Sequence, residues 1–387
     1  MRRSRSTRGC GRWCWGGALR VSSYLNLAAQ THRRRWRHLC GLKAPLTHHT
    51  LAYVTEHLNV ADRRHVLASV AKTLKANKAL EGCKLNGLLF LSLDANEHFH
   101  SRHRCCPDCC QRHVEVTDAQ GHKQRVIEYY HRYVVAQING PKLNVVLDLE
   151  PIRPGEGEGA AALRLLGRIR RVYGARFVDA VTVDAWYAKG PFLRRVERLG
   201  WAWVVVLKRE DMDVFGEAHR LSQDHPPGRA FADPERPRTV QWWEVKELDF
   251  SPQYGRKVRV VRPQEQWGRR IRHEPQTRRW VWASSAELDG DDARLIYRAG
   301  HRRWGIENKA FNELAQAYHL EHCYHHEPVS MLAQRLILML GFVLFSAFVE
   351  LHSKLVWLEK MTAKTLAQEL NLALEADLPW EQWFACG

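Results

Sequence analysis

Residues 177–208 read FVDAVTVDAWYAKGPFLRRVERLGWAWVVVLK, and they decide the expected fold. Two apolar runs in this stretch, 177–185 and 201–208, are rich in Val, which predicts two strands. The residues between them, Phe192 to Leu199, predict a short helix. Strands that alternate with helices are typical of a sheet covered by helices.

Three further strands are expected earlier in the chain, in runs that are rich in Val, Leu, Ile and Tyr and bounded by Gly, Pro and Asn. The runs are GLLFLSLDA (87–95), YYHRYVVAQI (129–138) and LNVVLDLEPI (143–152). A helix over Gly155 to Tyr173 follows them, with Glu156 and Glu158 in its first turn, where the helix dipole favours acids. Three adjacent strands followed by helix, strand, helix and strand predict an α/β fold with a mixed sheet flanked by helices.

The remaining segments differ from this pattern in composition. Residues 50–84 place apolar side chains at helical spacing, whereas residues 209–283 are polar and Pro-rich with short aromatic strands. We therefore interpret the latter as an insertion and not as a continuation of the sheet. The expected organisation is a basic, disordered arm (1–45), a helical N-terminal region (46–86), a main domain (87–350) with a Cys/His insertion (96–128) and a β-rich insertion (209–283), and a C-terminal helical tail (351–387). A mis-assigned start of the coding sequence is an alternative explanation of the arm.

The charge of the chain points to a polyanionic partner. Among 387 residues, 59 Lys and Arg outnumber 42 Asp and Glu, which leaves a formal charge of +17. Nucleic acid is the usual partner of such a basic protein. Ten Arg and no acid lie in residues 1–40, so the arm carries more than half of this excess. A hydrophobic content of 45% with 26% charged residues excludes collagen-like, coiled-coil and wholly disordered chains.

The cysteines and the apolar segments indicate the cytoplasm. Ten Cys in a chain of this length do not form a disulfide scaffold, and no apolar region typical of a secretory signal follows the Arg-rich start. The most apolar stretch, Leu336 to Val349, is about fourteen residues long, whereas a bilayer span needs about twenty. This stretch therefore predicts a buried helix, and no membrane partner is expected.

Three acids are candidates for catalysis. Asp94 and Asp184 each end an apolar strand, which is where open sheets place active-site groups, although an Asp at this position often caps the following turn instead. Glu307 lies in the helical stretch RRWGIENKAFNEL (302–314), at a spacing that puts it on the face of its large apolar residues. A carboxylate on such a face needs a cation, which is either Arg303, four residues earlier, or a metal held jointly with the two aspartates.

A site of three carboxylates has a preferred metal. Oxygen ligands from Asp94, Asp184 and Glu307 suit Mg²⁺ or Mn²⁺ and are too hard for zinc or copper. Two such ions about 3.5 to 4 Å apart activate the attacking oxygen and stabilise the leaving oxygen in phosphodiester chemistry. A basic protein with this site is a candidate nuclease or strand-transfer enzyme.

Three blocks of the sequence carry a resemblance to a known family. The blocks are LFLSLDANEHFHSRHRCCPDC (89–109), VTVDAWYAKGPFLRRVERLGWAWVVVLK (181–208) and YRAGHRRWGIENKAFNELAQAYHLEHCYHH (297–326). They resemble the first-Asp, second-Asp and Glu blocks of bacterial insertion-sequence DDE transposases of the IS-four type, and the likeness extends over roughly residues 45–350. The resemblance implies a ribonuclease H-like catalytic domain with the triad Asp94, Asp184 and Glu307.

The same resemblance implies a function and partners. It implies a DNA transposase in the bacterial cytoplasm that binds the terminal inverted repeats of its own element as double-stranded DNA, cuts at their ends and joins the freed 3′-OH to target DNA. A homodimer is expected in the DNA complex, and Arg303 and Lys309 are expected to contact DNA phosphates because they lie close to Glu307.

The sequence departs from the family at two positions of the Glu block. The family has Tyr three residues before the Arg and Lys seven residues after the Glu, whereas Gly300 and Leu314 occupy these places here, with Tyr297 one turn upstream. The alternatives are therefore a catalytically inactive, transposon-derived DNA-binding protein and a ribonuclease H-like nuclease without strand transfer.

Asp148 and Glu150, two residues apart on a predicted strand, compete with Asp94 for the first catalytic position, and we prefer Asp94 because of its motif.

The Cys/His insertion predicts a second kind of metal site. Cys106 and Cys109 have the CxxC spacing of half a zinc site, and neighbouring Cys and His residues are expected to complete a structural zinc site. The alternative is a surface loop of reduced cysteines.

Overall fold

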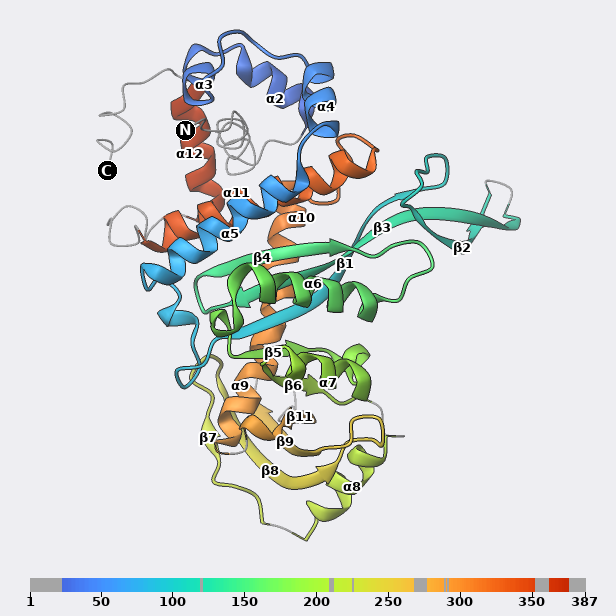
Figure 1. Cartoon of the computed structure of the whole chain (residues 1–387), viewed down its shortest axis with the longest axis vertical. Helices are drawn as coiled ribbons and strands as arrows, with labels where there is room; N and C mark the ends of the chain where they lie inside the picture. Colours follow the sequence, from blue (N-terminus) through green and yellow to red (C-terminus); the bar gives the residue numbers. More distant parts are fainter. Residues whose placement is uncertain are drawn as a thin grey trace.

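The fold is that of a computed structural model, in which residues 23–118, 121–208, 212–224, 226–267, 277–288, 290, 292–351 and 362–375 are described. One mixed sheet runs through the middle of the molecule, and helices cover its faces (Figure 1). The predicted α/β fold, a mixed sheet flanked by helices, is thereby confirmed.

The central strands have the order β4-β3-β1-β5-β6. The first three, β1 (Phe90–Ser101), β3 (Lys123–Asn139) and β4 (Asn144–Pro151), are antiparallel neighbours, and a short turn joins β3 to β4. The next two, β5 (Ala180–Val183) and β6 (Ala202–Val206), lie parallel to β1, because a helix separates each from the strand before it.

The strands of residues 209–283 extend this sheet. They are β7 (Phe231–Ala232), β8 (Arg238–Asp249), β9 (Lys257–Trp267), β10 (Thr277–Arg279) and β11 (Trp282–Ser285), the last of which ends just beyond the segment. β11 pairs antiparallel with β6 on one side and with β9 on the other. The expectation that this segment does not continue the sheet is therefore wrong, because the apolar strand β6 has an open edge that β11 covers.

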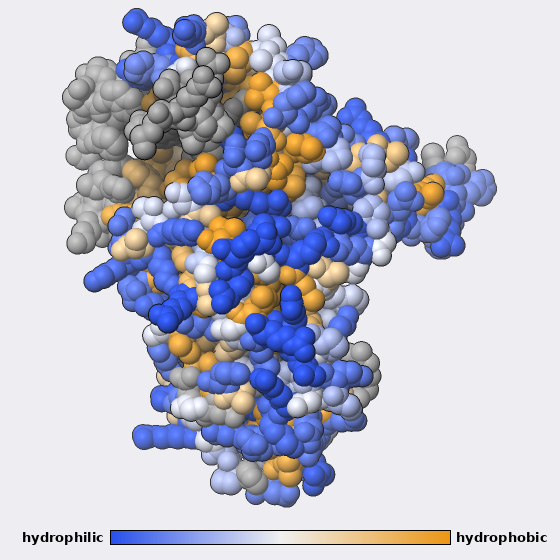
Figure 2. Space-filling view, viewed as in Figure 1, coloured by the Kyte–Doolittle hydropathy of each residue, from blue (hydrophilic) through white to orange (hydrophobic). Residues whose placement is uncertain are grey.

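The Cys/His insertion is mostly a ribbon of strands. β1 continues to Ser101, and β2 (Cys110–Thr117) pairs with the first half of β3. The ribbon projects from the body of the molecule, and hydrophilic side chains cover most of the visible face of its outer part (Figure 2). Asp94 thus lies within a long strand, and not at the end of a short one as the sequence predicts.

Helices pack on both faces of the sheet and above it. They are α2 (Tyr24–Thr31), α3 (Arg34–Leu39), α4 (His48–Glu56), α5 (Val60–Ala76), α6 (Glu158–Tyr173), α7 (Gly190–Arg198), α8 (Asp213–Leu221), α9 (Ala293–Arg303), α10 (Asn312–Tyr318), α11 (Pro328–Leu351) and α12 (Ala363–Glu375). Short turns of helix are η1 (Glu81–Cys83), η2 (Ala175–Phe177), η3 (Ala185–Tyr187), η4 (Ala286–Leu288) and the π-helical η5 (Ile306–Phe311).

The helix α11 contains the apolar stretch that the sequence singles out. Its length and mean hydropathy of 2.0 would allow it to cross a membrane, but 72% of its most apolar window is buried inside the protein. It packs against α4, α5, α10 and β4, and its side chains belong to the main hydrophobic core. This agrees with the prediction of a buried core helix.

The second half of the predicted arm is folded, whereas residues 1–22 lie outside the described residues. Tyr24 in α2 is buried against Leu51, and its hydroxyl donates a hydrogen bond to Thr55 Oγ1 over 2.8 Å. In α3, Trp36 is only 1% exposed. The expectation of a disordered arm is therefore wrong for residues 23–45, since a few apolar side chains among the arginines are enough to hold two short helices.

We predict that deleting residues 1–22 leaves the melting temperature unchanged within a degree or two, whereas deleting residues 1–44 lowers it strongly. The larger deletion exposes Leu51 and leaves Thr55 without its Tyr24 partner, and a buried aromatic side chain contributes about 3 kcal/mol or more. Thermal unfolding followed by circular dichroism measures both effects. Equal melting temperatures for the two deletions would show that α2 and α3 do not stabilise the core.

Candidate active site

The pairing of β1 with β5 aligns two of the three candidate acids. Phe90, Leu91 and Ser92 pair in parallel with Ala180, Val181 and Thr182, respectively. Continuing the same register by two residues sets Asp94 opposite Asp184. Because side chains alternate along a strand, these acids share one face with Ser92 and Thr182, whose hydroxyl oxygens are 2.8 Å apart.

The third acid reaches this face from the helical segment after α9. Glu307 lies in η5 and is in hydrogen-bond contact with Asp94. The buried guanidinium of Arg303 lies between them, with its Nη1 2.7 Å from Glu307 Oε1 and 3.4 Å from Asp94 Oδ2. The structure therefore brings Asp94 and Glu307 together, in contact with each other and with the same guanidinium group, that of Arg303.

Asp184 is close to the pair but not in contact with it. Its Oδ1 accepts a hydrogen bond of 2.9 Å from the backbone N–H of Trp186, so it caps the turn η3. Its charge nonetheless acts on Asp94. Both interpretations of a strand-end Asp thus apply to Asp184, which caps its turn and faces the other acids.

The approach of the Glu307 segment to the sheet depends on a glycine. A Cβ atom on Gly305 would lie 3.1 Å from Asn139 Cγ, closer than most Cβ contacts. The Asn139 side chain in turn donates a hydrogen bond of 2.7 Å to Ser92 Oγ. Gly305 therefore lets the backbone come close to β3 and β1, two residues before Glu307.

The π-helical turn corrects the expected position of Glu307. A π turn is wider than an α turn, so the α-helical spacing used for residues 302–314 does not hold across it. The Glu307 side chain is 44% exposed and not buried on the apolar face, whereas Arg303 is 2% exposed. Wide turns of this kind occur often at functional sites.

The electrostatics of the site leave its negative charge only partly neutralised. Burial and the contact with Glu307 raise the pKa of Asp94 to about 8, and Asp184 adds to the rise, while Arg303 opposes it. A hydrogen bond between two carboxyl groups needs a proton on one of them. A divalent cation would replace that proton, so the three all-oxygen side chains fit Mg²⁺ or Mn²⁺.

Asp148 and Glu150, which compete for the first position, have other partners. Arg168 Nε lies 2.6 Å from Asp148 Oδ2, and its Nη1 lies 2.6 Å from Glu150 Oε2. Arg64 and Arg164 also contact this pair, which is almost completely buried. These two acids are therefore neutralised by arginines of α5 and α6 and belong to the packing of those helices on β4.

The expected DNA contacts near Glu307 differ from one another. Lys309 is exposed, and its Nζ donates a hydrogen bond of 3.0 Å to the carbonyl of Pro141. Arg303 is buried, and its guanidinium contacts Asp94 and Glu307, so the expectation that it contacts a DNA phosphate disagrees with its position.

The departures from the family also have a structural explanation. A Cβ atom on Gly300 would lie 2.4 Å from Trp282 Nε1, so the indole ring occupies the space that the family's Tyr would need. Tyr297 is buried, and its hydroxyl donates a hydrogen bond of 2.9 Å to Asp233 Oδ2. Leu314, in the place of the family's Lys, is fully buried.

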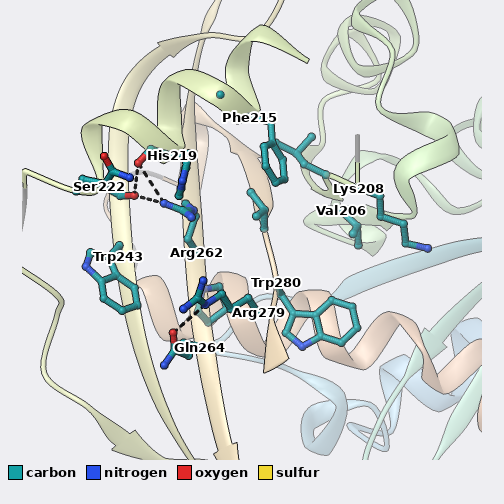
Figure 3. A pocket seen from close by; sticks show the side chains of 15 residues that line it. Val206, Lys208, Phe215, His219, Ser222, Trp243, Arg262, Gln264, Arg279 and Trp280 are labelled. Atoms are coloured by element: carbon teal, nitrogen blue, oxygen red, sulfur yellow. Dashed lines mark hydrogen bonds between the residues drawn. The ribbon is translucent and has the colours of Figure 1, made fainter. Parts of the chain in front are cut away.

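A cavity of about 1080 Å³ lies between α8 and the strands of the extended sheet (Figure 3). Its lining combines cations with aromatic rings, among them Lys208, Arg262, Arg279, Trp243 and Trp280. Burial and the nearby Arg279 lower the pKa of Arg262. No local sequence pattern predicts this cavity, because it depends on how the β-rich strands join the sheet.

Cys106 and Cys109 lie at the base of the ribbon together with His131 of β3 and His326, which precedes α11. The expected partners from the insertion do not join them. His103 and His113 are exposed, and His98 accepts a hydrogen bond from Arg335 instead. The two histidines could not be found from spacing, because they lie 22 and 217 residues from Cys109.

We predict opposite effects of two Asp→Asn substitutions on the metal-free protein. The raised pKa of Asp94 means that the folded state binds a proton that the unfolded state has released, so stability falls as pH rises from about 4 to about 8. Asp94→Asn should remove this loss and stabilise the protein at pH 8.5. Asp148→Asn should destabilise it by about 3 kcal/mol, because it removes one of the two buried carboxylates that neutralise Arg64 and Arg168.

Urea unfolding in EDTA at pH 5 and pH 8.5 measures the free energy of unfolding of both variants. A loss of stability in Asp94→Asn at pH 8.5 would contradict the partly neutralised site.

Comparison with known proteins identifies the family. Residues 113–344 match the transposase DDE domain family, in a segment that contains Asp184 and Glu307 and begins after Asp94. A solved structure of the piggyBac transposase synaptic complex with hairpin DNA is 12% identical, with a TM-score of 0.41; the alignment covers 74% of this chain and 52% of that one. No curated protein matches. Since the family match spans more than half of the sequence, the chain belongs to the transposase DDE domain family.

Proposed function

We propose that this protein is the DNA transposase of a bacterial insertion sequence of the IS-four type. It binds the terminal inverted repeats of its element, cleaves the DNA at their ends and joins the freed 3′-OH to target DNA. The observation that carries the proposal is the register of β1 and β5, which aligns Asp94 with Asp184 on the face that Glu307 reaches.

The catalytic assignment follows from this alignment. Asp94, Asp184 and Glu307 would hold Mg²⁺ or Mn²⁺, which supplies activation of the attacking oxygen and stabilisation of the leaving oxygen in phosphodiester chemistry. Arg303 holds the Asp94 and Glu307 carboxylates in place from the buried side. Gly305 sets the distance of the Glu307 segment from the sheet.

DNA binding is supported by exposed cations and rings near the triad. Trp186, two residues after Asp184, is 57% exposed, and Lys189 Nζ lies 4.5 Å from the centre of its ring. An exposed ring beside a cation offers a base a stacking surface and a phosphate a charge. The net charge of +17 and the basic, aromatic cavity of Figure 3 support the same partner. We further propose that the protein acts as a homodimer on its DNA, in the bacterial cytoplasm.

One observation favours a second candidate, a catalytically inactive DNA-binding protein derived from a transposon. Gly300 and Leu314 stand where the family has Tyr and Lys. The buried Trp282 ring fills the space beside Gly300, and Leu314 is itself fully buried. If these positions are essential for the reaction, DNA binding remains without cleavage. The nuclease without strand transfer stays open as the third candidate.

We predict that Asp94→Asn, Asp184→Asn and Glu307→Gln each lower Mg²⁺-dependent cleavage by on the order of 100-fold or more, because each removes a charged ligand with little change of shape. DNA binding should persist, since it depends mainly on contacts between cations and phosphates. The substrate is a duplex with the terminal repeat found in the DNA that flanks the coding region. Gel analysis of nicked and joined products measures both activities.

Glu81→Gln, which removes an exposed acid in η1, serves as the matched control and should cleave like the wild type. If the wild-type protein binds the repeat but never cuts it, the proposal of an active transposase is wrong and the second candidate, an inactive DNA-binding protein, takes its place. Cleavage without joined products would instead identify the nuclease.

We predict that Trp186→Ala weakens binding of the element's end about tenfold, as expected for the loss of one stacked base. Fluorescence anisotropy with labelled DNA measures the affinity. The control Tyr53→Ala removes an aromatic ring of similar exposure in α4, on a different part of the molecule, and should not change binding. Equal losses in both variants would indicate a non-specific effect.

A further inference from the structure

Two thiols and two imidazoles converge on one point at the base of the ribbon. Cys106 and Cys109 come from the turn before β2, His131 from β3 and His326 from the residues between α10 and α11. Their ligand atoms all lie within 4.8 Å of one another. Cys109 and His131 are buried, and the other two are partly buried. Among the described residues, no other group of three or more Cys, His, Asp or Glu side chains converges in this way.

The distances within the cluster are those of a tetrahedral metal site. The two Sγ atoms are 3.7 Å apart, the two Nε2 atoms are 3.4 Å apart, and three Sγ to Nε2 distances are 3.3 to 3.4 Å. A zinc ion with bonds of about 2.3 Å to sulfur and 2.0 to 2.1 Å to nitrogen requires separations of about 3.8, 3.3 and 3.6 Å for these pairs. The observed values fit within a few tenths of an ångström.

Hydrogen bonds alone do not account for this packing. Each Nε2 carries either one proton or one lone pair, and each thiol carries one proton. The four atoms therefore supply at most four protons, which is too few for a hydrogen bond in each of the five short contacts between them. A cation at the centre uses all four lone pairs at once.

The local backbone also favours a thiolate pair that binds a metal. The N–H of Cys109 donates to the carbonyl of Cys106 over 3.0 Å, which closes the turn of the CxxC segment. The N–H of Cys106 donates to Cys109 Sγ over 3.3 Å. A bond of this kind stabilises negative charge on sulfur.

Phe99, a residue of β1 with an unusual backbone conformation, packs against His326. Phe99 has a φ of +52° at the irregularity of β1, a conformation that bulky residues rarely adopt. Its ring centre lies 4.3 Å from that of His326. The irregularity therefore places an apolar ring against the ligand and shields the site.

We propose that Cys106, Cys109, His131 and His326 bind one structural zinc ion, which fastens the segment after the Glu307 helix to the β1–β3 ribbon. The ligand set of two thiolates and two imidazoles with four protein ligands is that of a closed, structural zinc site. His131 pairs directly with His98, four residues after Asp94 on β1. The ion therefore joins the continuation of the first-Asp strand to the chain that follows the Glu, and this proposal does not depend on the protein's cutting DNA.

Metal analysis of the full-length protein, purified without a His tag, tests the proposal. We expect about one zinc per chain in the wild type and less than about a fifth of that in Cys106→Ser and in His326→Ala. Cys105→Ser and His103→Ala change exposed neighbours in the same segment and should keep one zinc. Wild-type protein without zinc, with iron in its place, or a His326→Ala variant that keeps its zinc would overturn the four-ligand site.

Two further measurements keep the proposal testable if a variant does not fold. His326→Cys retains a metal ligand and should keep one zinc. Replacing zinc by Co²⁺ in the wild type should give the strong visible absorption of a tetrahedral site with thiolate charge transfer, and the spectrum should change in His326→Cys. An unchanged Co²⁺ spectrum in this variant would exclude His326 as a ligand. Chelation of the metal should also increase hydrogen exchange in residues 319–327 more than in β8.

Discussion

The parallel pairing of β1 with β5 is the constraint on which the candidate site depends. Its register, Ser92 beside Thr182, puts Asp94 in line with Asp184. Because side chains alternate, a slip of one residue would turn one acid toward the opposite face of the sheet, where Leu91 and Leu93 are fully buried. The hydrogen-bonded hydroxyls of Ser92 and Thr182 oppose such a slip, since it would bury them among apolar side chains. Packing on one face of the sheet therefore determines the chemistry on the other.

Charge distinguishes the two acidic clusters of the sheet. Asp148 and Glu150 face three arginines, so their charges are balanced and they stabilise the packing of α5 and α6. Asp94, Glu307 and Asp184 have Arg303 between two of them, and burial together with the remaining negative charge raises the pKa of Asp94. An acidic cluster whose charge is not neutralised by neighbouring side chains is typical of a functional site. A cluster that is neutralised by arginines is typical of a structural ion-pair network. The same residue types thus have different roles because of their neighbours.

The sequence predicts those features that depend on local pattern. Val-rich runs predicted the central strands, and their order predicted the fold class; the acids at the ends of these runs were found because polar residues interrupt apolar ones. Features that depend on long-range contact were missed or misjudged. No local pattern shows that β11 pairs with β6, that Tyr24 packs on Leu51, or that His326 approaches Cys109. The exposure of Glu307 was misjudged because a π turn has no simple signature in the sequence.

The candidate site and the Cys/His cluster lie on the same two parts of the chain. β1 carries Asp94 and, four residues later, His98, which pairs with His131 of the cluster; Glu307 precedes His326 by nineteen residues. Arg303 links Asp94 to Glu307 through charge, and a divalent cation between these carboxylates would compete for the same oxygens. The contacts around His131 and His326 involve none of these oxygens. A zinc ion bound by the Cys/His cluster would therefore hold the two chain segments together even while the contacts of Arg303 change. The carboxylates Asp94 and Glu307 could then exchange Arg303 for a divalent cation without a change in the positions of their chain segments.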